Sequence, residues 1–109
     1  MITLKNYPKK QMQKQYDIQT STRFAKDYKK YCKKNKNFKS IITSVVKTLS
    51  YDPHYYALKT HKVNTRIWGN VYSSRLTGDL RILWKFSAEK IDILLLELGG
   101  HSGKNSVYR

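Results

Sequence analysis

Acidic residues are scarce in this chain, and that scarcity limits its chemistry more than any other feature. The 109 residues include seven Asp and Glu against 22 Lys and Arg, which gives a formal charge of +15 at pH 7. Such an excess attracts polyanions, so it indicates a nucleic acid, an anionic membrane or an acidic protein as partner. Two-metal nuclease sites need several converging carboxylates. We therefore expect no bound metal and no cofactor, and any nuclease chemistry should be metal-independent.

Cysteines and long apolar runs are scarce as well. Cys32 is the only cysteine, which excludes an intramolecular disulfide and a multi-cysteine zinc site. No stretch approaches the roughly 18–20 apolar residues that span a bilayer. Residues 1–15 also lack the apolar centre of a signal peptide. We expect a cytoplasmic protein that does not act at membranes.

The patterns that are present predict an α+β fold. Residues 1–15 read as a basic N-terminal arm that is mobile unless it docks, and residues 16–109 as a single domain. Apolar residues at helical spacing predict a helical hairpin, with one helix from an N-cap at Ser21 to about Lys34 and another from about Phe38 to Ser50.

The second half of the chain changes to strand-like spacing. A loop is expected over residues 54–63, and strands over residues 66–75, 80–86 and 91–97, with a further short strand at residues 16–20. The turns between the long strands are short, which forces antiparallel pairing. The hairpin should cover one face of a small antiparallel sheet of three to four strands.

The residue types that suit metal-free RNA cleavage gather near the ends of the predicted strands. RNA can be cut by its own 2′-hydroxyl when a base removes that proton and an acid protonates the leaving oxygen, while cations stabilise the charged phosphorane. The candidate side chains are His61, Lys62, Arg75, Asp79, Arg81, His101, Lys104, Tyr108 and Arg109. Structural roles stay open for some of them. His61 could cap a loop, Tyr108 could pack in the core, and the two arginines could pair with Asp79 or Glu97.

The last eleven residues are the most informative stretch. Gly99 and Gly100 follow the most apolar run of the chain and should let the backbone turn freely. An imidazole, an ammonium, a phenol and a guanidinium come after them. A strand that ends in such a turn can fix reactive side chains at the edge of a rigid sheet, so the tail is predicted to form part of a site.

Three stretches carry a resemblance to a known family, and in chain order they are residues 59–63, residues 78–84, and residues 98–101 followed by Val107 and Tyr108. Their order and spacing resemble the RelE/ParE superfamily of type II toxin–antitoxin toxins, most of all the RelE-like and YafQ-like messenger-RNA interferases. The resemblance implies a toxin that cuts messenger RNA on the ribosome and arrests translation. It also implies a cognate antitoxin, typically with an acidic segment that wraps the toxin.

The resemblance assigns roles to individual residues. The YafQ-like pattern maps onto His61, Asp79 and His101, which would transfer protons and position the substrate. The RelE-like pattern maps onto Arg81 and Tyr108, which would stabilise phosphate and either stack on a base or abstract a proton. Arg75 stands where the YafQ-like pattern has a further histidine, so it would supply charge in place of a proton.

Substrate binding is expected of four basic residues, namely Arg75, Lys62, Lys104 and Arg109. Two other functions stay open from the sequence. One is a ParE-like toxin that inhibits DNA gyrase without catalysis. The other is a basic protein that binds RNA or the ribosome and has no enzymatic activity.

Overall fold

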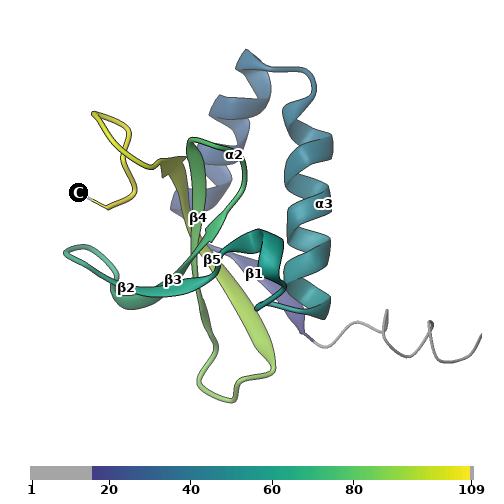
Figure 1. The fold of residues 1–109 in the computed structure, drawn as a ribbon, viewed down its shortest axis with the longest axis vertical. Coiled ribbons are helices and arrows are strands. Elements are labelled where there is room, and N and C mark those ends of the chain that lie inside the picture. The colour runs from purple at the N-terminus through teal and green to yellow at the C-terminus, as the bar shows by residue number, and fades with distance from the viewer. Residues whose placement is uncertain (1–15, 109) are drawn as a thin grey trace, which may run out of the picture.

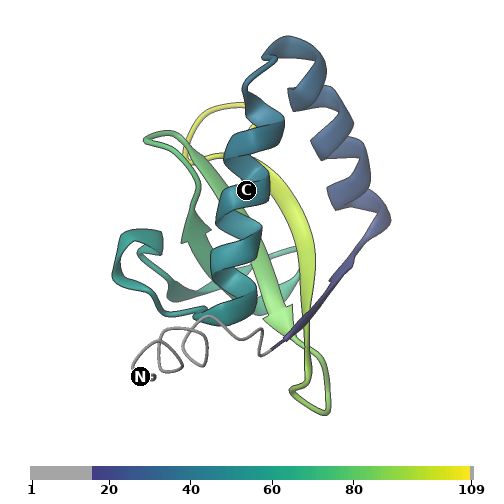
Figure 2. The same cartoon turned by 90° about the vertical axis from the view of Figure 1, so that its right-hand side faces the viewer.

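The computed structural model describes residues 16–108 and has two layers, a helical hairpin on one face of a five-stranded sheet (Figures 1 and 2). The elements in chain order are β1 (Asp17–Thr20), α2 (Thr22–Lys34), α3 (Phe38–Tyr51), the 3₁₀ turn η1 (Tyr56–Leu58), β2 (His61–Thr65), β3 (Gly69–Arg75), β4 (Leu80–Phe86) and β5 (Asp92–Gly100). The strand order is β1-β5-β4-β3-β2, and every pair is antiparallel except β1 with β5. The α+β fold with its helical hairpin is confirmed. The sheet has five strands where three to four were expected, and the N-terminal arm lies outside the described residues.

Strand β5 lies between β1 and β4 and is buried on both faces, which explains its nearly continuous apolar sequence. One core lies under the hairpin and includes Leu95 and Leu98 of β5. A second, smaller core lies on the other face and consists of Val71, Leu83, Leu96 and Val107. Because Val107 belongs to this second core, the C-terminal tail is part of the fold and not a loose end.

The hairpin begins and ends where the sequence predicted. The Ser21 hydroxyl accepts a hydrogen bond from the Phe24 backbone N–H at 2.9 Å and donates one to the Leu96 carbonyl at 2.6 Å. It therefore caps α2 and ties its first turn to β5. The second helix ends one residue before Asp52, and Pro53 follows.

A buried carboxylate network, which the sequence did not reveal, attaches α2 to β5. Asp27 accepts hydrogen bonds from the Leu98 backbone N–H at 3.0 Å and from Arg23 Nε at 3.1 Å. Arg23 Nη2 also lies 3.0 Å from Glu97 Oε2, and Glu97 Oε1 accepts a hydrogen bond from the indole N–H of Trp68 at 2.8 Å. Two of the chain's seven acidic residues, Asp27 and Glu97, thus link α2 to β5.

The prediction for residues 54–75 was partly wrong. The expected loop over residues 54–63 contains the start of β2, and the expected single strand over residues 66–75 begins with a turn at residues 66–68. The Thr65 hydroxyl accepts a hydrogen bond from the Trp68 backbone N–H at 2.9 Å, and Gly69 leaves the turn at φ 73°. Strand β2 lies at the sheet edge and is mostly exposed, so it lacks the apolar alternation that marks a half-buried strand.

Candidate active site

Except for Lys62, the candidate residues of β2, β3 and β4 lie on the sheet face opposite the hairpin. Ser74 points to the hairpin side, since its hydroxyl accepts a hydrogen bond from the buried Trp84 indole at 2.8 Å. Neighbouring side chains of a strand point to opposite faces, so Ser73 and Arg75 point away from the hairpin. Strand pairing then sets His61 opposite Ser73 and Arg81 opposite Arg75. These β2–β4 residues form one side of the candidate site.

The C-terminal tail folds back over the same face and forms the other side. After β5 the chain loops and returns, so that the Val107 N–H donates to the Gly100 carbonyl at 2.9 Å. Tyr108 then lies against β3, where its phenol oxygen is 2.5 Å from the Ser73 hydroxyl oxygen. The exposed His101 ring meets the Tyr108 ring edge to face, with 5.5 Å between the centroids. The two tail residues that the sequence singled out are therefore in contact.

The predicted role of the two tail glycines was wrong. Both belong to β5, and neither has a positive φ. Gly99 is instead required for close packing, because a Cβ at this position would lie 2.7 Å from the Asn105 carbonyl oxygen and 2.9 Å from Val107 Cγ1. The tail can return across β5 only where the strand has no side chain.

The β3–β4 turn is attached to the tail. The Asp79 carbonyl accepts a hydrogen bond from the His101 backbone N–H at 2.7 Å. Burial raises the pKa of the Tyr31 phenol of α2, and the negative charges of Asp27 and Asp79 raise it further. The Asp79 backbone thus ties the β3–β4 turn to the start of the tail, beside His101.

The two arginines bind backbone carbonyls of the turn. Arg81 Nη1 donates to the carbonyls of residues 77, 78 and 80 at distances of 3.0, 3.2 and 3.1 Å. Arg75 Nε lies 3.4 Å from the Thr77 carbonyl oxygen. Within residues 16–108 neither arginine forms an ion pair with Asp79 or Glu97. The ion pairs that the sequence left open for the two arginines are therefore not formed.

Two guanidinium groups on directly paired residues repel each other unless an anion lies between them. Replacing Arg75 with Gln should therefore stabilise the isolated protein by about 0.2–1 kcal/mol. It should also weaken the binding of single-stranded RNA that the charge of +15 predicts. In a plot of the logarithm of the RNA-binding constant against the logarithm of the salt concentration, the slope should become shallower by about 0.7. That is the value for one lost phosphate contact. Urea unfolding and a salt series of RNA binding measure both effects. Arg66→Gln, in the exposed β2–β3 turn, is the matched control and should leave the stability unchanged.

The remaining candidates are less closely associated with this site. Lys62 pairs with Tyr72, whose ring stacks on Trp84, so it points to the opposite face from His61. Lys104 is exposed at the outer end of the tail loop, and Arg109 lies outside the described residues. His61 is exposed, and its Nδ1 lies 2.9 Å from the Lys59 carbonyl oxygen, which fixes the ring orientation.

Ser73 is the residue that the sequence analysis missed. It is fully buried, and its hydroxyl is the hydrogen-bond partner of Tyr108, 35 positions further along the chain. A serine inside a strand carries no local signal of such a role. Only the return of the tail across β5 reveals it.

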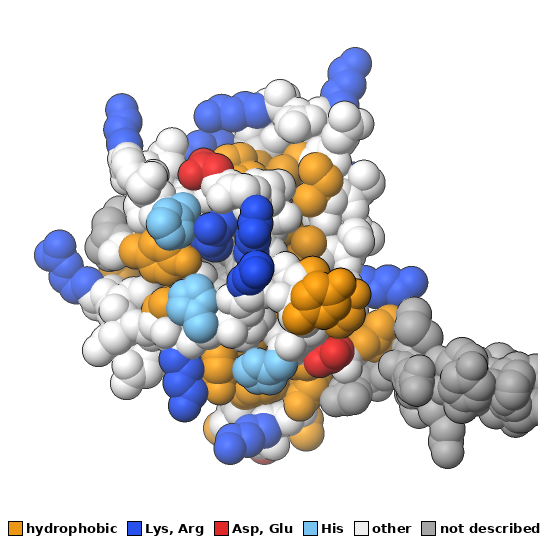
Figure 3. Space-filling model, in the orientation of Figure 1, with side chains coloured by type: hydrophobic (Ala, Val, Ile, Leu, Met, Phe, Trp, Pro, Cys, Tyr) orange, Lys and Arg blue, Asp and Glu red, His pale blue; other side chains and the backbone are white. Residues whose placement is uncertain are grey.

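Figure 3 shows histidine side chains gathered on one face of the molecule among Lys and Arg side chains. The described part of the chain contains no group of three or more His, Cys, Asp or Glu that could hold a metal. It also contains no helix that is long and apolar enough to cross a membrane.

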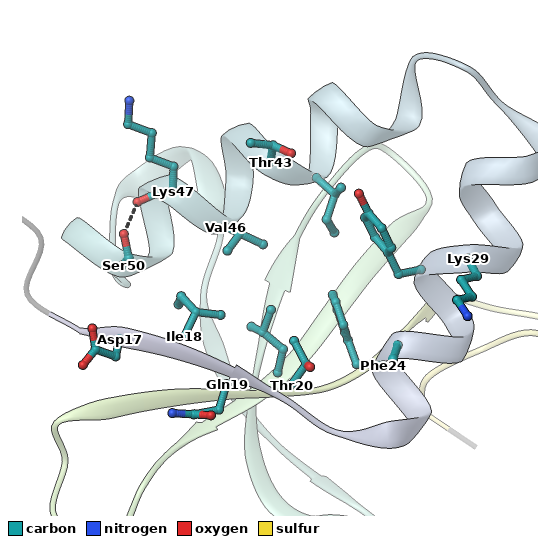
Figure 4. Close-up of a pocket in the computed structure, with 14 residues that line it drawn as sticks. Asp17, Ile18, Gln19, Thr20, Phe24, Lys29, Thr43, Val46, Lys47 and Ser50 are labelled. Atoms are coloured by element: carbon teal, nitrogen blue, oxygen red, sulfur yellow. Dashed lines mark hydrogen bonds between the residues drawn. The ribbon is translucent and has the colours of Figure 1, made fainter.

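A groove of about 920 Å³ lies elsewhere, between the hairpin and β1 (Figure 4). Ile18, Phe24 and Val46 point into it, whereas Lys47 points away. Its lining contains no histidine and only one carboxylate, that of Asp17. The groove therefore lacks the acid–base pair that the tail and the β-strands bring together.

The sequence matches no protein-family model and no curated protein. The structure, in contrast, resembles several solved toxins. A chain of the E. coli DinJ–YafQ complex superposes with a TM-score of 0.65 at 20% identity, covering 80% of this chain and 94% of its own length. The metal-bound toxin from Helicobacter pylori superposes with a TM-score of 0.65 at 25% identity, covering 79% of this chain and 94% of its own length. A chain of the archaeal RelE–RelB complex from Pyrococcus horikoshii OT3 superposes with a TM-score of 0.61 at 19% identity, covering 77% of this chain and 92% of its own length.

The chain has the RelE/ParE toxin fold. The predicted resemblance is thereby confirmed at the level of architecture. In this RelE/ParE fold the chain's own His101, Tyr108 and Arg81 lie on the sheet face that the hairpin leaves uncovered.

Proposed function

We propose that this protein is the toxin of a type II toxin–antitoxin system and a metal-independent endoribonuclease that cuts messenger RNA on the ribosome. One observation carries the proposal: the exposed His101 imidazole contacts the Tyr108 ring on the sheet face that also carries the side chains of Arg75 and Arg81. Those groups meet the three needs of cleavage by the 2′-hydroxyl, namely a base, an acid and cations for the phosphorane. The RelE/ParE fold supports the toxin assignment.

His101 and Tyr108 are the groups proposed to move protons. One removes the proton of the 2′-hydroxyl as its oxygen attacks phosphorus, and the other protonates the departing 5′-oxygen as the P–O bond breaks. Arg81, with Arg75 opposite it, stabilises the negative charge on the phosphorane. Asp79 and His61 flank this centre and position the RNA.

The proposed partners follow from charge and from the structural neighbours. A formal charge of +15 suits docking on ribosomal RNA and inhibition by an acidic antitoxin. The solved E. coli DinJ–YafQ structure is a toxin–antitoxin complex, and the archaeal RelE structure is a complex with RelB. We infer that a cognate antitoxin neutralises this chain in the cytoplasm.

Mapping messenger 5′ ends after brief induction in cells tests the proposed function. New 5′ ends should appear inside translated regions within minutes, and translation should stop without DNA damage. DNA damage with intact messenger would instead indicate a gyrase inhibitor. Tight RNA binding without new 5′ ends would indicate a binding protein that lacks activity.

A further inference from the structure

Two exposed tyrosines lie in contact on the turn that leads into β2, outside the candidate site. Tyr56 is 79% exposed and Tyr55 is 42% exposed. Their ring centroids are 4.8 Å apart, with an angle of 45° between the ring planes. Neither ring belongs to one of the two cores. Exposed apolar residues that stand singly need no explanation, but two adjacent aromatic rings offer a large contact surface to a partner.

The turn that carries this tyrosine pair is firmly attached to the fold. Leu58, in the 3₁₀ turn itself, is buried in the core under the hairpin. The Thr60 hydroxyl oxygen lies 2.7 Å from the Pro53 carbonyl oxygen and 2.7 Å from the Ser74 hydroxyl oxygen. Because both ends of the turn are held, the exposure of the two rings is set by the fold. A contact surface that is already ordered loses little conformational entropy when a partner binds.

Strand pairing relates the turn to the candidate site. His61 of β2 is paired with Ser73 of β3, and the contact between Thr60 and Ser74 continues this pairing by one residue. The turn therefore enters the sheet at the end of β3 that finishes with Arg75. That end of β3 is also the one that carries the candidate site.

The tyrosine pair is within reach of a strand bound at the candidate site. Tyr56 precedes His61 by five positions, so their Cα atoms are at most about 18 Å apart. Because Ser74 points to the hairpin side, an RNA strand has to pass around the start of β2 to reach the pair. Single-stranded RNA, whose bases can be splayed out, can follow this path. Figure 3 shows hydrophobic side chains beside Lys and Arg side chains on the face where the histidines gather.

Positive charge borders the pair. Lys59 follows the 3₁₀ turn, and its exposed side chain forms no ion pair within residues 16–108. A hydrogen bond with Tyr56 raises the pKa of Tyr55, and the negative charge of Asp52 adds to the shift, so the Tyr55 phenol is neutral at neutral pH. Single-stranded RNA presents bases that stack on aromatic rings and phosphates that bind cations. A neutral aromatic surface next to a free ammonium group matches both.

We propose that Tyr56, with Tyr55 packed beside it, stacks on a base of single-stranded RNA whose scissile phosphate lies at His101 and Tyr108. Lys59 binds a phosphate next to that base. Stacking of this kind accepts any base, so the pair adds affinity without selecting a sequence. This inference rests on the proposed function, because it takes the RNA substrate as the ligand. RNA is favoured over an acidic peptide because one strand supplies both the base and the phosphate.

A pair of oligonucleotides separates stacking from charge. One is a hexaribonucleotide with 2′-O-methyl groups, which cannot be cut through its 2′-oxygen, and the other is the same hexamer without bases. Tyr56→Ala should weaken binding of the full hexamer by about fivefold to 150-fold, the effect of one lost stack. Its binding of the abasic hexamer should stay within about twofold of that of the parent protein. Tyr56→Phe keeps the ring and should bind the full hexamer within about twofold of the parent protein.

Lys59→Gln should act through charge instead. It should weaken binding of both hexamers and make the slope of the logarithm of the binding constant against the logarithm of the salt concentration shallower by about 0.7. Tyr56→Ala should leave that slope unchanged. Ile91→Ala is the control for lost apolar surface, since Ile91 is 61% exposed and lies in the turn between β4 and β5. It should change the affinity for the full hexamer less than about twofold.

Two-dimensional NMR of the full chain, labelled in its tyrosine rings, gives a direct readout. The Tyr56 ring signals should move when the full hexamer is added and stay in place with the abasic hexamer. Unchanged affinity of Tyr56→Ala for the full hexamer, or no RNA binding at all, would overturn the proposal. Equal weakening of both hexamers by Tyr56→Ala would also overturn it, because a lost stack cannot affect a strand without bases.

Two further outcomes assign the surface or the function differently. A larger shift of the Tyr56 ring signals with an acidic peptide than with RNA would reject the proposal and make the pair a protein-binding surface. Stacking without messenger cleavage in cells would reject the nuclease function and retain the RNA site. Messenger cleavage with unmoved Tyr56 ring signals would reject the stacking alone.

Discussion

His101→Ala should lower RNA cleavage by about 10²–10⁴-fold, the usual contribution of one general acid or base. The imidazole is exposed and contacts the Tyr108 ring, while the hydrogen bond that holds this position comes from the backbone N–H to Asp79. Alanine keeps that backbone bond, so stability should change by less than about 0.5 kcal/mol. Single-turnover cleavage of RNA on translating ribosomes, with urea unfolding in parallel, measures the two effects.

His54→Ala is the matched control for this variant. His54 is also exposed, but it lies edge to face with Tyr72 at 5.7 Å, on the hairpin side of the sheet. The cleavage rate of this variant should stay within a few fold of that of the parent protein.

Tyr108→Phe separates packing from chemistry, since it keeps the ring and removes the hydroxyl that meets Ser73. Undiminished cleavage by both His101→Ala and Tyr108→Phe would remove the tail from the mechanism.

Gly99→Ala should abolish cleavage although it adds only one methyl group and touches no reactive side chain. The methyl carbon would lie 2.7 Å from the Asn105 carbonyl oxygen and 2.9 Å from Val107 Cγ1. Those atoms belong to the returning tail, so the tail must move away from β5 and take Tyr108 with it. Overpacking of this kind costs about 1–3 kcal/mol. The loss of activity should be at least as large as for His101→Ala, because the contact between His101 and Tyr108 is lost as a whole.

Two measurements distinguish this explanation from general unfolding. Amide hydrogen exchange at Val107, whose N–H donates to the Gly100 carbonyl, should accelerate while exchange in the centre of β4 stays slow. Gly78→Ala is the control: a methyl group there meets no atom within 4 Å, and Gly78 does not have a positive φ. A Gly99→Ala protein with slow Val107 exchange and full cleavage would show that the tail does not depend on this close packing.

The sequence predicted the elements whose signals are local. The helical hairpin follows from apolar periodicity and from the cap at Ser21, both of which lie within a few residues of the structure they specify. The apolar run over residues 91–97 predicted the strand that forms most of β5 for the same reason. His101 was expected in a turn after the two glycines, and its side chain is exposed.

The features that the sequence did not reveal depend on contacts between distant segments. Residues 66–68 resemble a strand because Ile67 and Trp68 are apolar, yet they form a turn in which the Trp68 indole reaches Glu97, 29 positions away. The partner of Tyr108 is a serine 35 positions earlier. Gly99 was interpreted through its conformational freedom, whereas the structure requires its small size. Each of these facts depends on which segments the fold brings together.

The chemical nature of the fragment ends tests the central claim most directly. RNA cut by its own 2′-hydroxyl leaves a 2′,3′-cyclic phosphate on the upstream fragment and a 5′-hydroxyl on the downstream one. Mass spectrometry of messenger fragments from a purified translation reaction should find these ends, and a 2′-deoxy substitution at the cleavage position should prevent cutting. Fragments with 3′-hydroxyl and 5′-phosphate ends, or unchanged cutting of the 2′-deoxy substrate, would contradict a site built from His101, Tyr108 and two arginines.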